Sequence, residues 1–289
     1  MSAILTAPER VPLVDGGDRD EAQEHVSIVT IVCVVIVCTM VLAALLAPLL
    51  PLQSPNTVNL LDVFSGPSSR HLLGTDSAGR DILARLIYGT RLSLLGPLFV
   101  IAIATFVGVP LGLIAGYRGD WLDSLLSRIF DVVFAFPPLV LAIVIVATFG
   151  PGFKNAVLAV SVTYVPLMAR VVRSGALVER EKAYVDACRV QGFGGARICS
   201  RHIGPSLTGL ISSQFAVYFA YSLLDLAALS FLGLGTQPPT ADWGGMLSDA
   251  QHGIFQSASG LFPPSVAIVL LVVSFSLLAD RFADRREKR

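Results

Sequence analysis

Long apolar runs alternate with short polar stretches along the chain, and this pattern predicts membrane-spanning helices. A helix needs about 20 apolar residues to cross a hydrocarbon core about 30 Å thick, because each residue rises about 1.5 Å. Lipid cannot satisfy exposed backbone groups, which helices satisfy internally. We therefore expect an all-α integral membrane protein with about six transmembrane helices. The six segments are Val26–Leu50, Leu92–Gly116, Leu125–Phe149, Asn155–Val172, Leu207–Leu234 and Leu261–Ala279.

Two of these segments carry features that bear on helix packing. The third begins with polar residues, among them Arg128 and Asp131, which are spaced to pair with each other, and it is interrupted at Pro137-Pro138. In the second, glycine recurs every four residues. A stripe of small residues lets a neighbouring helix approach closely, although glycine is also generally frequent in membrane helices. The stripe consists of Gly108, Gly112 and Gly116.

Composition supports a membrane protein and excludes several other classes. Of the 289 residues, 54% are hydrophobic and 15% are charged, whereas a soluble domain carries about 25% charged residues. The net charge of +0 gives no indication of a nucleic-acid partner. No two cysteines have the C-x-x-C spacing, so neither a disulfide framework nor a metal site is expected. The four cysteines are Cys33, Cys38, Cys188 and Cys199.

The distribution of basic residues predicts the orientation. Lysine and arginine gather between the fourth and fifth spans and again at 281–289, whereas Gly235–Gly260 contains none. The positive-inside rule then places both termini and the basic segment in the cytoplasm. The segment 51–91 would lie outside although it contains four arginines, which three nearby aspartates partly balance. Residues 1–25 are rich in acids, unlike a signal peptide, and are expected to form a flexible cytoplasmic tail.

The basic segment 182–206, KAYVDACRVQGFGGARICSRHIGPS, predicts two helices joined by a glycine turn. Good helix formers run from Glu179 to Gln191, and Gly192 follows as a stop signal. A second helix is expected over Ala196–His202, ending at Gly204-Pro205. Small residues on the first helix would let another protein approach closely. Composition alone favours a solvated loop attracted to anionic lipid headgroups, whereas the order and spacing of the residues favour a docking element for a cytoplasmic partner.

This segment resembles the "EAA" signature of binding-protein-dependent ABC importer permeases. The matching positions are Asp186-Ala187-Cys188, Gly192 and His202-Ile203-Gly204-Pro205, with Asp for Glu, Cys for the second Ala, His for Ile and Gly for Leu. Three further blocks are similar to the "C"-type permease of dipeptide, oligopeptide and nickel importers. They are His71–Leu94, Phe149–Gly152 and Leu229–Leu247, and the resemblance extends from about Pro51 to Asp280.

The resemblance implies a type I ABC importer transmembrane domain over 92–280, with a coupling loop at 175–205. The remaining parts would be the tail 1–25, a first span at 26–50, an extracytoplasmic loop at 51–91 and a basic tail at 281–289. The chain would form half of a heterodimeric pathway with a second permease subunit and would import short peptides, with glutathione or nickel as alternative cargo. The residues expected to dock on an ATPase are Asp186, Ala187, Cys188, Arg189, Gly192, Arg197, Arg201 and Pro205.

The partners implied are two ABC ATPase subunits and an extracytoplasmic substrate-binding protein, in a bacterial cell membrane. No G-x-x-x-x-G-K-[ST] string occurs, so ATP and Mg²⁺ are expected on the ATPase subunits and no cofactor on this chain, which is not expected to be an enzyme.

Two rival classes of protein are disfavoured. An ion-coupled secondary transporter predicts internal repeats and several intramembrane carboxylates, and an intramembrane enzyme needs a nucleophile with its base or a set of metal ligands.

Two further groups of residues are candidates for contact with solute or partner. Asp225 and, more weakly, Gln214 lie within the fifth span; Asp225 either lines the translocation path and meets the amine of a peptide, or is a buried carboxylate bonded to hydroxyls such as that of Ser222. An amphipathic helix near Ile82–Ile87 is expected to lie at the outer membrane surface or to form a platform for the binding protein. The residues expected to face the binding protein are Arg80, Arg85, Gln237, Asp242 and Trp243.

Overall fold

The computed structural model describes residues 17–251, 253–255 and 258–287, and within them the fold is helical with no β-strand. An isolated antiparallel bridge between Thr75 and Asp81 is recorded in the long loop before α2. Five helices are long and apolar enough to cross a membrane, and a bent pair makes up to six. The expectation of an all-α protein with about six spans is therefore confirmed.

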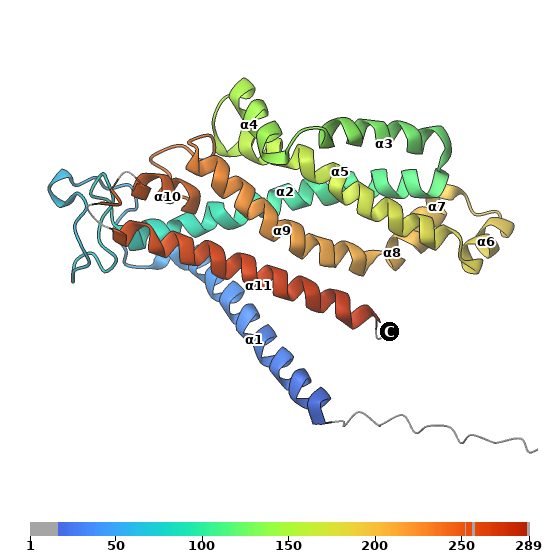
Figure 1. Ribbon diagram of the computed structural model, residues 1–289, viewed down its shortest axis with the longest axis horizontal. Coiled ribbons are helices and arrows are strands. Elements are labelled where there is room, and N and C mark those ends of the chain that lie inside the picture. The colour runs from blue at the N-terminus through green and yellow to red at the C-terminus, as the bar shows by residue number, and fades with distance from the viewer. Residues whose placement is uncertain (1–16, 252, 256–257, 288–289) are drawn as a thin grey trace, which may run out of the picture.

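Four long helices, α2, α5, α9 and α11, run along the longest axis of the molecule, while α1 diverges from them (Figure 1). The loop 51–81 and α10 lie at one end, called the α10 end below, and the helices α6 to α8 lie at the other, called the α6 end. The helices are α1 Gly17–Leu46, α2 Ile82–Arg118, α3 Asp120–Phe134, α4 Pro138–Phe149, α5 Phe153–Arg180, α6 Ala183–Val190, α7 Gly195–Ile198, α8 Gly204–Ser206, α9 Thr208–Phe231, α10 Trp243–Gln251 and α11 Phe262–Glu287.

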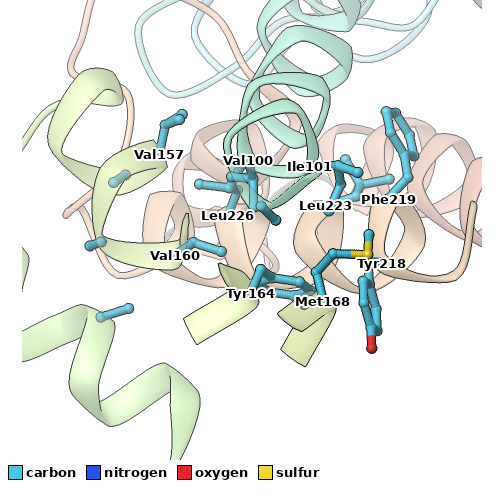
Figure 2. Close-up of a cluster of buried hydrophobic side chains, with 14 of the residues drawn as sticks. Val100, Ile101, Val157, Val160, Tyr164, Met168, Tyr218, Phe219, Leu223 and Leu226 are labelled. Atoms are coloured by element: carbon cyan, nitrogen blue, oxygen red, sulfur yellow. The ribbon is translucent and has the colours of Figure 1, made fainter. Parts of the chain in front are cut away.

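The central core lies where α2, α5 and α9 meet (Figure 2). Val100 of α2 and Met168 of α5 have no exposed surface, and Leu223 of α9 is 2% exposed. Tyr164 of α5 packs edge-on against Tyr218 of α9, with ring centroids 5.7 Å apart. These contacts join three helices that are far apart in sequence.

The glycine stripe of α2 lies directly against α5, as its spacing predicted. A Cβ at Gly112 would lie 2.5 Å from the carbonyl oxygen of Ala169, and a Cβ at Gly116 would lie 2.7 Å from that of Arg173. Gly108 is equally close to the backbone of Val165. Such distances leave no room for a side chain, so the two helices pack backbone to backbone.

The segment before the second predicted span is not a separate surface helix, and that expectation is wrong. The helix α2 is continuous for 37 residues from Ile82, or about 55 Å. Asp81 caps it by accepting a hydrogen bond from the Ala84 amide at 2.7 Å. Gly89 does not break the helix, and a Cβ at this position would lie only 3.3 Å from the Cα of Asp242. The residues Ile82–Ile87 are therefore the first turns of a spanning helix.

The third predicted span is a bent pair of helices, α3 and α4, that meet at 83°. Pro137 has an extended ψ of 132°, because a residue that precedes a proline avoids the helical region. The 12 residues of α4 reach about 18 Å and cannot cross a bilayer alone.

Ion pairs tie α3 to α5, and the pairing predicted within α3 is wrong. Asp131 pairs with Arg170 of α5 at 3.0 Å, not with Arg128. Asp123 accepts a hydrogen bond from Nη2 of Arg173 at 2.6 Å. A partner on a neighbouring helix replaces the local partner because both aspartates face α5.

Several helices also extend beyond their predicted ends. The helix α5 continues from the predicted Val172 to Arg180, and α11 continues to Glu287 through most of the predicted tail 281–289. The tail 1–25 overlaps α1, which begins at Gly17. Residues 1–16 and 288–289 lie outside the described part of the chain.

Replacing Gly112 by alanine should weaken the α2–α5 contact. The new Cβ would meet backbone, which cannot rotate away, so we expect a loss of about 1–3 kcal/mol of stability. The melting temperature of the detergent-solubilised protein measures this loss. Gly66→Ala is the matched control, because a Cβ there meets nothing within 4 Å. Equal melting temperatures for the two variants would contradict the close approach.

Candidate functional site

The candidate site is the segment 179–206 at the α6 end, which begins with a corner between α5 and α6. Glu179 accepts hydrogen bonds from Nζ of Lys182 at 2.6 Å and from the hydroxyl of Tyr184 at 2.7 Å. Arg180 donates to the carbonyl oxygen of Gly116 at 3.2 Å. The helix expected over Glu179–Gln191 is therefore broken after Arg180. Side chains that bind across the corner hold α6 at a set position relative to α5 and α2.

The helix α6 turns one face toward the chain and the other toward solvent. Val185 is 0% exposed and Cys188 is 8% exposed, and both pack into the hydrophobic core. The opposite face carries exposed residues at positions i, i+3, i+4 and i+7, which lie together on a helix. We call this the α6 face: Ala183, Asp186, Ala187 and Val190.

Burial changes two assignments made from the sequence. Cys188 points into the chain, so its expected role in docking is wrong: its side chain fills a core position. Val190 was missed, although it is 89% exposed. The helical spacing could have revealed Val190 as an exposed residue. On a helix, Val190 lies on the same side as Ala183 and Asp186, opposite the buried side chains of Val185 and Cys188.

Gly192 ends α6 as its position predicted. Its φ of +79° is accessible to glycine without steric cost. The Gly192 amide donates to the Arg189 carbonyl at 3.0 Å, and the Phe193 amide donates to the Cys188 carbonyl at 3.1 Å. These are the two hydrogen bonds of a Schellman motif, which satisfies the last carbonyls of a helix.

The following helix is longer than predicted because it contains a π-helical turn. The helical segment runs from Gly195 to Ser206, with Cys199–Ile203 in the π conformation. The expectation that Gly204-Pro205 ends the helix is wrong. A π turn is wider than an α turn and removes the clash that a proline ring makes with the preceding turn. Ile203 has no exposed surface and anchors the turn, while Pro205 remains exposed.

Aromatic rings of the same chain orient two of the three predicted arginines. The guanidinium of Arg189 lies 5.5 Å from the ring centroid of Tyr117 and donates to Asp186 at 2.9 Å. Arg197 lies 5.0 Å from the ring centroid of Phe193. Both arginines and Arg201 are exposed. Their charges therefore border the α6 face and stay available to an acidic partner.

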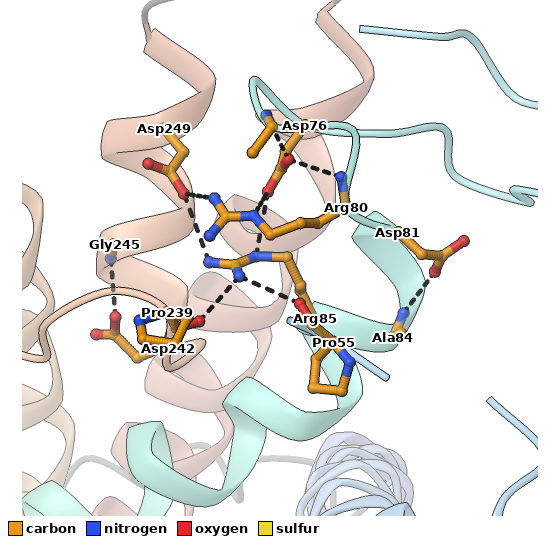
Figure 3. Close-up of polar contacts among 11 residues, drawn as sticks. Pro55, Asp76, Arg80, Asp81, Ala84, Arg85, Pro239, Asp242, Gly245 and Asp249 are labelled. Carbon is orange, nitrogen blue, oxygen red and sulfur yellow. Dashed lines mark hydrogen bonds and ion pairs between the residues drawn. The ribbon is translucent and has the colours of Figure 1, made fainter. Parts of the chain in front are cut away.

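The α10 end contains a cluster of buried ion pairs (Figure 3). Arg80 contacts Asp76 at 2.7 Å and Asp249 at 2.8 Å, and Arg85 contacts the same two carboxylates at 3.3 Å and 3.5 Å. Arg85 also donates to the carbonyl oxygens of Pro55 and Pro239. Two arginines thus join the long loop, α2, the loop before α10, and α10 itself.

Burial also corrects most of the residues expected to face a binding protein. Arg80 and Arg85 are 7% and 3% exposed, because they bind carboxylates within the chain. Trp243 is 1% exposed, and its indole donates to the Leu86 carbonyl at 3.2 Å. Asp242 is buried and accepts a hydrogen bond from the Gly245 amide. These four side chains hold the α10 end together and have almost no surface to offer, whereas Gln237 is exposed.

The two candidate residues of the translocation path lie on α9. Asp225 is half-buried and accepts a hydrogen bond from the Tyr164 hydroxyl at 2.8 Å. Ser222, its expected partner, instead donates to the Phe219 carbonyl. Gln214 is half-buried one and a half turns from Phe219 toward the α6 end. The partner on α5 was not predictable because it lies 61 residues away.

Comparison with known proteins gives consistent matches over most of the chain. A family model described as "binding-protein-dependent transport system inner membrane component" matches residues 108–289. The dipeptide transport system permease protein DppC of Alkalihalophilus pseudofirmus is 43% identical over 219 residues, 76% of this chain and 72% of that protein. The glutathione transport system permease protein GsiD of Pectobacterium atrosepticum is 40% identical over 235 residues, 81% of this chain and 78% of that protein.

Asp242 should make the stability of the protein depend on pH. Burial raises the pKa of its carboxyl to about 6, above about 4 in an unfolded chain. The folded state binds this proton more tightly, so ionisation weakens the fold above about pH 6, by about 3 kcal/mol at most, and the penalty is absent below about pH 4. We expect Asp242→Asn to raise the melting temperature at neutral pH and to converge with the wild type as the pH falls through this window. A difference that does not change with pH would contradict the assignment.

Proposed function

Because the chain belongs to the family of binding-protein-dependent transport system inner membrane components, we propose that it is the permease subunit of an ATP-driven importer of short peptides. Support comes from its identity to a dipeptide permease over most of its length. Glutathione is the alternative cargo, since similar permeases carry that name, and nickel remains a third. The observation that carries the mechanism is the exposed α6 face on a segment held tightly to the bundle.

The α6 face has the properties of a surface that docks into another protein. Two of its four side chains are the methyl groups of Ala183 and Ala187, so a partner can approach the helix backbone closely. Val190 adds exposed apolar area, and Asp186 and Arg189 add opposite charges at the border. We assign this face, with Gly192, Arg197, Arg201 and Pro205 around it, to the contact with an ATPase subunit.

ATP and Mg²⁺ would act on two partner ATPase subunits, and this chain would turn their movement into transport. The side chains of Val185, Ile198 and Ile203 are fully buried, so the docking segment moves with the bundle and not independently of it. When ATP brings the two ATPases together, the α6 segments would follow. The bundle would then shift between inward-open and outward-open states.

Two further partners complete the proposed assembly. A second permease subunit would form the other half of the pathway, and lipid would cover the remaining exposed apolar side chains. An extracytoplasmic binding protein would dock at the α10 end, where Gln237 and the apolar side chains of Leu60 and Leu61 are exposed. The buried arginine cluster would support this surface from beneath.

We propose that the α6 end and both termini face the cytoplasm of a bacterial cell. The four arginines in 51–91 no longer oppose this orientation, because three of them are bound within the chain. Arg80 and Arg85 pair with aspartates, and Arg91 donates to the Ala44 carbonyl at 2.6 Å. These arginines have a structural role at the α10 end, whereas the basic residues of 173–201 carry the positive-inside bias.

A bulky residue on the α6 face should prevent assembly with the ATPase. Ala187→Trp adds a large side chain at an exposed position and does not disturb the core. We expect co-purification of the ATPase subunits to fall about tenfold or more, the equivalent of about 1.4 kcal/mol. Ser54→Trp, exposed at the opposite end, is the matched control and should co-purify normally. Normal ATPase recovery with Ala187→Trp would exclude this face as the contact.

Cysteine labelling should confirm the orientation. In a chain whose four native cysteines are replaced, expressed without the ATPase subunits that would cover the α6 face, we expect Val190→Cys to react with a membrane-impermeant maleimide only in inverted vesicles. Leu61→Cys should react only in right-side-out vesicles; the two native side chains are 89% and 94% exposed, so both sites are accessible. Labelling of Val190→Cys from outside would reverse the proposed topology.

A further inference from the structure

A stripe of long polar side chains follows one face of the spanning helix α9. Its members lie at positions i, i+4, i+7 and i+11 and therefore project from one side of the helix. Its ends are 11 residue steps apart, or about 16 Å, from the α6 half of the helix toward the α10 end. We call these residues the α9 stripe: Gln214, Tyr218, Tyr221 and Asp225.

Asp225 differs from the aspartates of α3 because no cation of the protein neutralises it. Asp123 and Asp131 each pair with an arginine of α5. Asp225 receives a hydrogen bond from Tyr164, and within the described part of the chain no lysine, arginine or histidine forms an ion pair with it. Ionisable groups inside a membrane are costly, and an unpaired one marks a functional site by default.

The carboxylate keeps unused capacity for hydrogen bonds. A carboxylate can accept about four hydrogen bonds, and the Tyr164 hydroxyl uses one of them on Oδ2. Asp225 is also only partly buried in this chain, and its other oxygen forms no hydrogen bond within the described residues. An ammonium group has three hydrogen-bond donors and a positive charge. It can therefore fill the free acceptor positions of the carboxylate and neutralise its charge.

One tyrosine ring one helical turn from Asp225 is open to a cation. Tyr164 and Tyr218 hold each other edge-to-face at 5.7 Å (Figure 2), and Tyr221 is 56% exposed on the face that carries Asp225. Aromatic faces attract ammonium groups. A carboxylate with the exposed ring of Tyr221 one turn away therefore has the chemistry of a site for an organic cation.

We propose that Asp225, positioned by Tyr164, binds the protonated α-amino group of a peptide as it passes along the α9 stripe. This inference rests on the proposed function and adds the group of the substrate that the pathway recognises. Tyr221 would contact the ammonium group through its ring, and Gln214 would offer an amide to the peptide nearer the α6 end. Asp225 would hold the ammonium group and select for it, and it makes no covalent bond to the peptide.

The test uses the complete transporter in proteoliposomes, with the second permease, the ATPases and the binding protein. Asp225→Asn keeps the shape of the side chain and removes its charge, so peptide uptake should fall roughly tenfold, the range of one charge-assisted hydrogen bond. ATP hydrolysis stimulated by loaded binding protein should stay within about twofold of the wild type, because the α6 face is intact. Tyr164→Phe should reduce uptake less, and Ser222→Ala, the matched control, should leave uptake unchanged.

A charge-rescue experiment separates recognition of the cation from a structural role. Asp225→Cys is placed in a chain whose Cys33, Cys38, Cys188 and Cys199 are replaced by alanine. Modification by the negatively charged sulfonatoethyl methanethiosulfonate should restore uptake, whereas the positively charged trimethylammonium reagent should not. The rescue also requires that water-soluble reagents reach the position, as a solute pathway demands.

Three results would overturn the inference. One is normal uptake by Asp225→Asn, and another is an equal response to both reagents. The third is a joint loss of uptake, ATPase stimulation and melting temperature in Asp225→Asn, which would indicate a structural carboxylate. Wild-type transporter that takes up no peptide would instead refute the proposed function, and the inference with it; peptide uptake by the wild type alongside unimpaired Asp225→Asn refutes the inference alone.

Discussion

The close approach of α2 and α5 is the constraint on which the rest of the structure depends. Glycines at three successive turns of α2 remove the side chains that would separate the two backbones. The close contact between α2 and α5 ends at Gly116. The carbonyl oxygen of Gly116 accepts a hydrogen bond from Arg180 just before the corner between α5 and α6. Tyr117, the next residue, lies beneath Arg189 of α6. The packing of these two apolar helices thus determines where the polar segment 179–206 lies.

The two ends of the bundle are held by different kinds of interaction. At the α10 end, Arg80 and Arg85 bind carboxylates and carbonyls from segments up to 169 residues apart. Buried ion pairs add little net stability, but the loss of one partner is costly, and in some proteins they select one arrangement. At the α6 end, buried apolar side chains such as Val185 and Ile198 provide the anchor. The charges there remain exposed, which suits a surface that meets another protein.

Local patterns predicted much of this structure, and the failures occur where distant residues decide the outcome. Apolar runs predicted the spans, and Gly192 was correctly placed as the end of α6, because span length and helix termination depend on neighbouring residues. The pairing of Arg80 with Asp249 could not be predicted from local spacing, so arginines that are buried were expected at the surface. Cys188 was misassigned for a similar reason: its neighbours in sequence are exposed, and the side chains that bury it come from other elements. The π turn at 199–203 also escaped prediction, since Gly-Pro normally indicates a helix end.

The helix α9 contains the α9 stripe and begins two residues after the segment 179–206 ends. It runs uninterrupted from Thr208 to Phe231 and contains neither glycine beyond its first turn nor proline. Asp225 lies 17 residues from Thr208, or about 26 Å. Helix kinks arise mostly at proline, glycine or π turns, and the π turn of this region lies before α9, in the docking segment itself. Thr208 and Asp225 therefore belong to one rigid helix, and under the proposed function a movement of its α6 end would carry the stripe with it.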